Sequence, residues 1–371
     1  MPISTEVIGF VVKLFCLSTM FGMGLSVSLK DILSPFHNKL ALAIIVSVNN
    51  VLLPLIGLVI VVLVTTLPEG MEAVVLPKAS EVAFVLLLMA SGTYLGPFFA
   101  RLSHAPDDLA HGVMVVLVFV SIVSIPLTVM LVSSGSSDTE HIFSQISENQ
   151  RIPMTLLTFQ LLPLAIGLLV KERFSALADP LRPVIGQFAT FLFLVLAALL
   201  LVWQGSPAPA APEDVTERSI SVSSMQQFIA LLQENGWITS LSGLGETIGP
   251  YIFMAALSAF LMVVGNLTGK IINNMTKVDA PACPRIMTTS TAVRNVSAVL
   301  ILLVSGSNGS VEDFGGSVAY PVGYVVAFYL ISLIIAGVKV NGWAQETPPV
   351  VSDSAPPETQ SRGIQKHVIG A

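Results

Sequence analysis

The chain has 371 residues, of which 53% are hydrophobic and only 11% are charged, and its formal net charge is −6. Soluble domains carry about 25% charged residues, so this composition excludes an ordinary soluble domain and predicts an all-α polytopic membrane protein. We therefore expect the lipid bilayer as a partner, and no nucleic acid.

Nine apolar runs are long enough to cross about 30 Å of hydrocarbon at about 1.5 Å per residue. The first is not a cleavable signal, because it lacks a basic leading region and an Ala-x-Ala site. Residues 1–342 are predicted to form the transmembrane domain, and residues 343–371 a disordered cytoplasmic tail. The longest loop is predicted at 205–245. The runs lie near residues 6–27, 39–65, 81–101, 109–133, 152–170, 184–204, 247–272, 284–305 and 316–341.

The placement of lysine and arginine predicts the orientation of these runs. Three basic residues fall in the loops on the side of the N-terminus, and twelve fall in the loops and tail on the other side. Since cytoplasmic loops are the basic ones, we expect the N-terminus outside and the C-terminus inside. We expect a multi-pass protein of the cell membrane, which is the inner membrane in a Gram-negative cell.

Two runs are interrupted. The third contains "ASGTYLGPFFA", in which Gly92, Gly96 and Pro97 break the helix, and the eighth contains "TTSTAVRN" around Arg294. The two runs are five crossings apart, so they point in opposite directions. Discontinuous helices at inverted positions are typical of the central binding site of a secondary transporter.

Five segments resemble the bile-acid:sodium symporter family in order and position. The resemblance covers roughly residues 15–340 and implies inverted repeats with two broken helices that cross in a core domain. The implied core contains the runs near 39–65, 81–101, 109–133, 247–272, 284–305 and 316–341, and the implied panel contains those near 6–27, 152–170 and 184–204. The segments are "FGMGLSVSLKDI" (21–32), "VSVNNVLLPLIGL" (46–58), "SGTYLGPFFARL" (91–102), "VSIVSIPLTVML" (120–131) and "TAVRNVSAVLIL" (291–302).

The family's sodium ligands are largely replaced. Asn49, five residues before Pro54, matches a family Gln, and Asn295 is retained. Elsewhere the family's Ser-Asn pair falls on Leu95 and Gly96, its hydroxyls on apolar residues near Met114 and Val118, its Glu on Ser290 and its Gln on Arg294.

These replacements argue against sodium coupling, because hard cations need several oxygen ligands and usually a negative charge. In the family one Glu and two sodium ions sum to +1, and here Ser290 and Arg294 also sum to +1. Our hypothesis is that Arg294 is a built-in substitute for the coupling ions.

Arg294 has two interpretations. It can cap the free carbonyls of a half-helix, or it can offer a bidentate fork to a carboxylate, and the two roles can coexist. A charge at this depth costs about 2.5–3.5 kcal/mol on insertion scales, which favours a functional role. The candidate substrate- and ion-binding residues are Arg294, Asn295, Ser290, Thr291, Asn49, Thr93, Gly92 and Gly96.

The stretch "SHAPDDLAH" (103–111) offers His and Asp residues to a metal, but Pro106 followed by two acids is also an ordinary helix start, which we prefer. No metal site or cofactor is predicted. The HExxH and GxSxG motifs do not occur, so an enzyme is not predicted.

The preferred function is a secondary transporter that moves a small or amphipathic organic anion by alternating access, independently of sodium. Two alternatives stay open: a sodium- or proton-coupled symporter with a different ion site, and a membrane sensor that does not transport. The short stretch after Trp343 argues against a sensor with a large effector domain. A coupling cation is therefore a second possible small partner.

Overall fold

The computed structural model describes residues 5–65, 78–95, 98–99, 102–103, 107–133, 152–202, 237–276, 282–306 and 319–346. Within these ranges every regular element is a helix, which confirms the all-α prediction.

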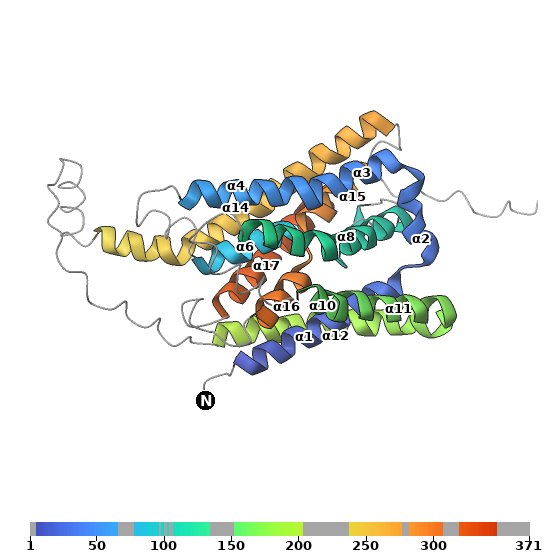
Figure 1. Cartoon of the computed structure of the whole chain (residues 1–371), viewed down its shortest axis with the longest axis horizontal. Helices are drawn as coiled ribbons and strands as arrows, with labels where there is room; N and C mark the ends of the chain where they lie inside the picture. The colour runs from blue at the N-terminus through green and yellow to red at the C-terminus, as the bar shows by residue number, and fades with distance from the viewer. Residues whose placement is uncertain are drawn as a thin grey trace, which may run out of the picture.

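The helices form one elongated bundle (Figure 1). Up to residue 133 they are α1 (Thr5–Ser26), α2 (Leu29–Leu33), the 3-10 helix η1 (Ser34–His37), α3 (Lys39–Ser47), the π-helix η2 (Val48–Leu52), α4 (Leu53–Thr65), α6 (Lys78–Met89) and α8 (Asp107–Ser133). Beyond it they are α10 (Ile152–Leu156), the π-helix η3 (Leu157–Leu161), α11 (Leu162–Arg173), α12 (Ser175–Val202), α14 (Trp237–Thr276), α15 (Ala282–Ala292), α16 (Val296–Gly306) and α17 (Ala319–Glu346).

Eight spans among the described residues are long and apolar enough to cross a membrane. They match all the predicted runs except the third, near 81–101, where α6 has 12 residues and ends at Met89. This early end is the predicted break. α8 begins at Asp107, as expected for an acidic helix start.

Three predicted boundaries were wrong. α12 begins at Ser175 rather than near 184, because two prolines in its first turns are accommodated inside the helix. α14 begins at Trp237, inside the predicted loop 205–245, because hydropathy detects only the membrane-embedded part of a longer helix. α17 continues through residues 343–346, and the rest of the predicted tail lies outside the described residues.

The end of α17 is anchored by Trp343, which is only 9% exposed. The guanidinium carbon of Arg285 lies 5.9 Å from the Trp343 ring centre, and the Lys339 ammonium lies 5.4 Å from it. Cation–π contacts of this kind are worth about 0.5–1 kcal/mol at exposed sites and more when desolvated. The contact with Arg285 holds the last turns of α17 against α15.

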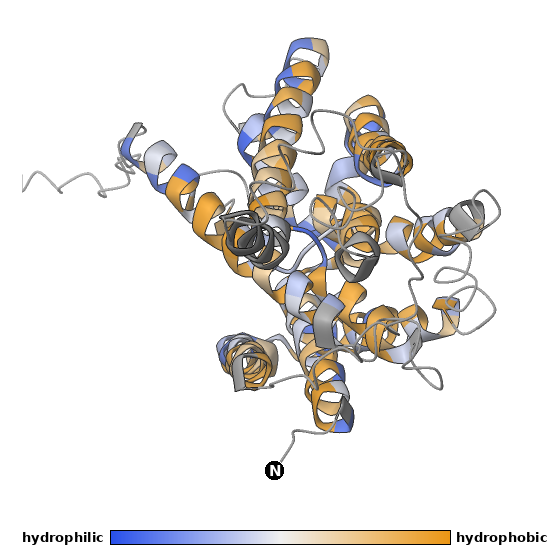
Figure 2. Ribbon diagram, turned by 90° about the vertical axis from the view of Figure 1, so that its left-hand side faces the viewer, coloured by the Kyte–Doolittle hydropathy of each residue, from blue (hydrophilic) through white to orange (hydrophobic). Residues whose placement is uncertain are grey.

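Large apolar side chains cover the outside of the bundle. Met154, Ile334 and Val338 are 66%, 67% and 72% exposed. Hydrophobic residues make up most of the long helices in Figure 2. Such a surface would drive aggregation in water and suits a lipid environment, so the protein is a multi-pass membrane protein.

Helices α1, α11 and α12 pack against one another along one side of the bundle (Figure 1). The contact between α1 and α11 depends on two glycines that face each other. A Cβ on Gly24 would lie 2.3 Å from the main-chain oxygen of Leu164, and one on Gly167 would lie 2.4 Å from that of Phe21. Close backbone approach through small residues is typical of membrane helix pairs. These helices are those assigned to the panel domain on the sequence, and the division into panel and core stays a prediction.

A second close helix pair joins α14 to α15. A Cβ on Gly265 would lie 2.5 Å from the main-chain oxygen of Met287, and one on Gly269 would lie 2.3 Å from the Cα of Pro284. Backbone atoms cannot move aside as a flexible side chain can. The spacing of four residues places both glycines on the same face of α14.

Gly265→Ala should therefore destabilise the protein, because the added methyl group meets backbone of α15. Overpacking of this kind costs about 1–3 kcal/mol. Gly337→Ala is the matched control: no atom lies within 4 Å of its added Cβ, and alanine favours the helix by up to about 1 kcal/mol. Thermal unfolding in detergent should show a lower Tm for the first variant and an unchanged or higher Tm for the second. Equal Tm values would contradict the packing.

Candidate functional site

The first helix break follows α6. The chain leaves the helix after Met89 and is irregular from Ala90 to Thr93. Gly92 has φ +79°, and a Cβ there would lie 2.8 Å from the main-chain oxygen of Met114 on α8. Both the positive φ and the close approach require glycine at this position. Gly96, the other predicted glycine of the break, lies outside the described residues.

The second break separates α15 from α16, between Ala292 and Val296. Residues 285–303 are all buried. The amide of Asn295 donates to the main-chain oxygen of Ala90 at 3.1 Å, so the two breaks contact each other directly. The sequence predicted both breaks, and the structure brings them together.

A π-helical turn brings a third segment to this crossing. In η2 the amide of Leu53 donates to the oxygen of Val48, five residues earlier. The next donor in that register would be Pro54, which has no N–H group. The main-chain oxygen of Asn49 is therefore left without its helical donor.

Arg294 donates hydrogen bonds to the oxygens that these interruptions leave without a helical donor. Its Nε donates to the main-chain oxygen of Leu87 at 2.9 Å, and its Nη1 donates to Asn49 Oδ1 at 2.9 Å. Its Nη2 donates to the main-chain oxygens of Asn49, at 3.3 Å, and of Leu88. The side chain is 0% exposed.

These bonds match the capping interpretation of Arg294. The last carbonyls of a helix have no partner within it and carry its negative dipole end. At the end of α6 the amide of Ala90 donates to the main-chain oxygen of Leu86. Arg294 donates to the next two main-chain oxygens, those of Leu87 and Leu88. The guanidinium thus binds helix-end oxygens, and no face of it is open to a ligand in this conformation.

Asn50, next to Asn49, links the same crossing to α8. Its Oδ1 lies 2.7 Å from the hydroxyl of Ser91 in the first break and 3.1 Å from that of Ser124. The Ser91 hydroxyl also lies 3.2 Å from the main-chain oxygen of Leu117. The sequence favoured Asn49 over Asn50, and the structure gives each amide a separate set of contacts.

The hydroxyls among the candidate residues have local roles. Ser290 donates to the main-chain oxygen of Met287 at 3.2 Å, and Thr93 accepts from the amide of Leu95 at 3.4 Å. The hydroxyl of Thr291 is buried without a hydrogen-bond partner. All three lie at the breaks, and none of them contacts Arg294 through a hydrogen bond.

Gln160 belongs to the crossing and was missed on the sequence. It lies in η3, is 0% exposed, and its Oε1 accepts from Asn295 Nδ2 at 3.3 Å. Its own Nε2 has no partner. An available signal was Pro163, three residues later, since Asn50 likewise precedes a proline, Pro54, by four residues.

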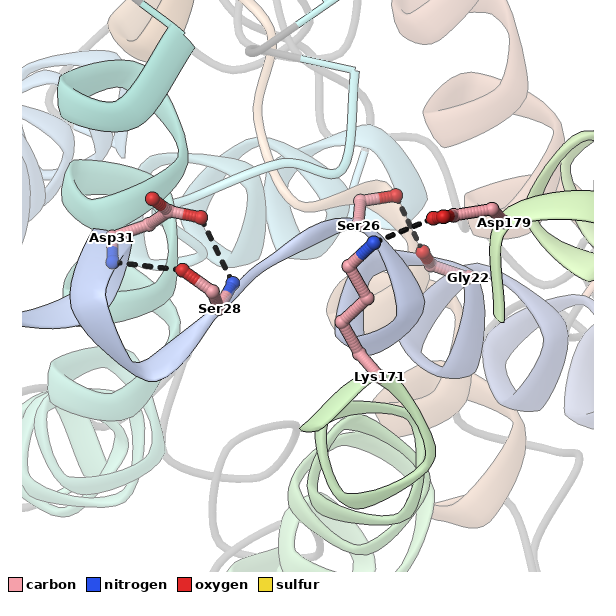
Figure 3. A network of polar contacts seen from close by, with 6 residues as sticks. All are labelled: Gly22, Ser26, Ser28, Asp31, Lys171 and Asp179. Atoms are coloured by element: carbon pink, nitrogen blue, oxygen red, sulfur yellow. Dashed lines mark hydrogen bonds and ion pairs between the residues drawn. The ribbon is translucent and has the colours of Figure 1, made fainter. Parts of the chain in front are cut away.

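A cavity of about 650 Å³ lies between α1, α12 and the segment that follows the first break. None of the candidate residues lines it. Three of its lining residues, Gly22, Ser26 and Asp179, are drawn in Figure 3, and Lys171 pairs with Asp179 at 2.6 Å. The lining residues are Ser18, Thr19, Gly22, Met23, Ser26, Tyr94, Leu95, Phe98, Asp179, Arg182, Pro183, Gly186, Ala189 and Thr190.

Aromatic side chains pack beside one end of this cavity. Tyr329 on α17 donates a hydrogen bond to the hydroxyl of Tyr94 at 3.0 Å. The Tyr329 ring packs edge-on against Phe193 of α12 at 4.8 Å, and Phe193 lies 5.7 Å from Phe15 of α1. The cavity therefore adjoins an apolar layer between α17 and the α1–α12 side.

A helical membrane bundle with two broken helices in contact and a large cavity beside them has the architecture of a transporter. The profile of the Sodium Bile acid symporter family matches residues 13–207, more than half of the chain. The chain belongs to this family, whose members are membrane transporters rather than enzymes. No curated protein matches it. The second break lies beyond the matched residues.

Arg294→Leu should lower the Tm. It removes a charge that is costly at this depth, by about 2.5–3.5 kcal/mol on insertion scales. It also leaves three buried main-chain oxygens without a donor, at about 1–3 kcal/mol each, so the net effect is a loss of stability. Arg294→Lys should lower the Tm less, since an ammonium has three donors and can still bind some of these oxygens.

Arg173→Leu, at the exposed end of α11, is the control for loss of a positive charge. Thermal unfolding of the purified proteins gives the Tm of Arg294→Leu, Arg294→Lys and Arg173→Leu. A Tm for Arg294→Leu equal to that of the wild type would contradict the capping role.

Proposed function

We propose that this transporter moves a small or amphipathic organic anion by alternating access and does so without sodium. Arg294 supplies at the crossing the positive charge that coupling ions supply in sodium-dependent relatives. The observation that carries this proposal is the set of four hydrogen bonds from the buried guanidinium to the oxygens of Leu87, Leu88 and Asn49.

Carbonyl and amide oxygens are the ligands that hard cations prefer. At this crossing such oxygens are already bound by a guanidinium, which cannot lose its charge at ordinary pH. A sodium ion placed among them would meet a like charge about 3–4 Å away, which is unfavourable by several kcal/mol in a protein interior. The position where the family has a Glu is Ser290, whose hydroxyl already donates within its own helix.

The 650 Å³ cavity is the proposed substrate site. It reaches from Tyr94 and Leu95, after the first break, to the beginning of α12. In the orientation predicted from the basic residues, that beginning is cytoplasmic. The conformation is then the inward-facing state of the cycle.

Alternating access requires the α1, α11 and α12 side to move against the rest of the bundle. Polar contacts between described residues cross this boundary. The thiol of Cys16 on α1 donates to the main-chain oxygen of Ser297 at 2.9 Å, and Asn295 donates to Gln160. The edge-on packing of Phe193 against Tyr329 crosses it as well.

Uptake into proteoliposomes should not depend on sodium. Replacing sodium by choline at constant ionic strength should leave the rate of anion uptake unchanged, because Arg294 already binds the oxygens of the crossing. The measurement is uptake of a bound anion found by thermal-shift screening, with and without sodium. Loss of uptake in choline would show that a separate sodium site exists.

Ser297→Cys should allow the moving parts to be locked. The new thiol belongs to the residue whose main-chain oxygen is 2.9 Å from Cys16 Sγ, and a mercuric ion that bridges the two sulfurs should stop uptake. Excess dithiothreitol, whose thiols take the mercuric ion from the two cysteines, should restore it. The same substitution in a Cys16→Ser background is the control and should be insensitive to mercury.

Full activity of the bridged protein would show that α1 and α16 do not separate during transport. Cys283, the other cysteine of the chain, is present in both backgrounds and so does not affect the comparison.

A further inference from the structure

We propose that Arg182 on α12 binds the charged group of the substrate, and that Arg294 does not touch it. This inference rests on the proposed function. It makes Arg182 the residue that selects anions over neutral molecules, and it assigns substrate recognition and charge compensation to two different arginines.

The cavity lining contains two charged residues among those described, Asp179 and Arg182. The carboxylate of Asp179 is 2.6 Å from the ammonium of Lys171, which offsets its charge (Figure 3). Arg182, which also has an interaction within the protein, is the cation among the described residues of the lining. Arg294 is fully enclosed and does not line the cavity.

The position of Arg182 on its helix directs it to the cavity. Asp179, Arg182, Gly186 and Thr190 all line the cavity, and their spacing of three and four residues places them on one face of α12. A Cβ built on Gly186, one turn after Arg182, would meet no atom within 4 Å. The absence of a side chain there leaves room for a ligand directly beside the guanidinium.

The hydroxyl groups that α1 and α12 present to the cavity cannot replace Arg182 as donors. Ser18 and Thr19 donate to main-chain oxygens of α1, and Ser26 donates to that of Gly22. On α12, Thr190 donates to that of Gly186. A hydroxyl whose proton is used in this way presents only lone pairs, which repel an anionic oxygen and accept from an O–H or N–H group.

The lining thus defines a class of substrate. A carboxylate or sulfonate binds at Arg182, whose planar group has five donors and can form a bidentate pair while it keeps its existing interaction within the protein. Hydroxyl or amide groups of the substrate donate to the oxygens on α1. The apolar part of the substrate lies against Met23, Leu95 and Phe98. The ligand is an amphipathic organic anion that also carries hydrogen-bond donors.

The test uses the purified full-length chain and three hydroxylated anions, cholate, gluconate and mandelate, each beside its uncharged methyl ester or amide. Calorimetry gives the Kd of each pair for the wild type and for Arg182→Gln. The variant should weaken binding of the anion about ten- to a hundredfold and leave that of the neutral partner unchanged. Arg182→Lys should keep the preference for the anion with reduced affinity.

Two further variants make the outcome decisive. Arg173→Gln removes an exposed positive charge at the same end of the protein and should leave every Kd unchanged. Gly186→Leu fills the open space and should abolish binding of charged and neutral forms alike, at an unchanged Tm.

Undiminished anion preference in Arg182→Gln overturns the assignment of Arg182. Unchanged binding in Gly186→Leu overturns the assignment of the cavity. Failure of every anion to bind the wild type overturns the proposed function itself.

Discussion

The buried guanidinium of Arg294 holds three segments of the chain together, and the central part of the bundle depends on it. α6 ends at Met89 in the interior, and the proline after η2 frees the main-chain oxygen of Asn49. Unpaired oxygens at that depth would be very unfavourable, because neither lipid nor water can satisfy them. One side chain with five donors meets this requirement. The broken helices that a transporter needs are therefore made possible here by a fixed cation.

The surroundings of this crossing combine tight and loose packing. Gly265 and Gly269 press α14 against α15, and Gly24 and Gly167 press α1 against α11, so each pair is held by backbone contact. Between the two groups of helices, apolar side chains from both sides share one hydrophobic cluster, and the polar contacts include the Cys16 thiol and the Asn295–Gln160 amide pair. Backbone contact within a group and mainly side-chain contact between groups would suit the proposed movement of two bodies.

The helices and both breaks could be predicted from the sequence, because hydropathy, glycine and proline are local signals. The start of α12 was predicted too late because of its two prolines, since local rules do not show when a helix accommodates a proline. The partners of Arg294 could not be predicted, because they are backbone oxygens whose availability depends on where α6 ends and on the π-register of η2. The cavity residues of α12 were missed for a related reason. The sequence of this helix has the pattern of an ordinary apolar span, and only its packing shows which face lines the cavity.

A cation that belongs to the protein differs from a bound ion in how it responds to voltage. Sodium ions are released after each crossing, whereas Arg294 travels in both directions and moves no net charge over a complete cycle. The charge moved by the proposed carrier is then that of its substrate alone. For a monovalent anion, an inside-negative potential of about 100 mV is worth about 2.3 kcal/mol, or about fiftyfold in concentration, in the outward direction. Replacement of the coupling ions by Arg294 would thus convert an accumulating importer into a carrier that the membrane potential drives toward export.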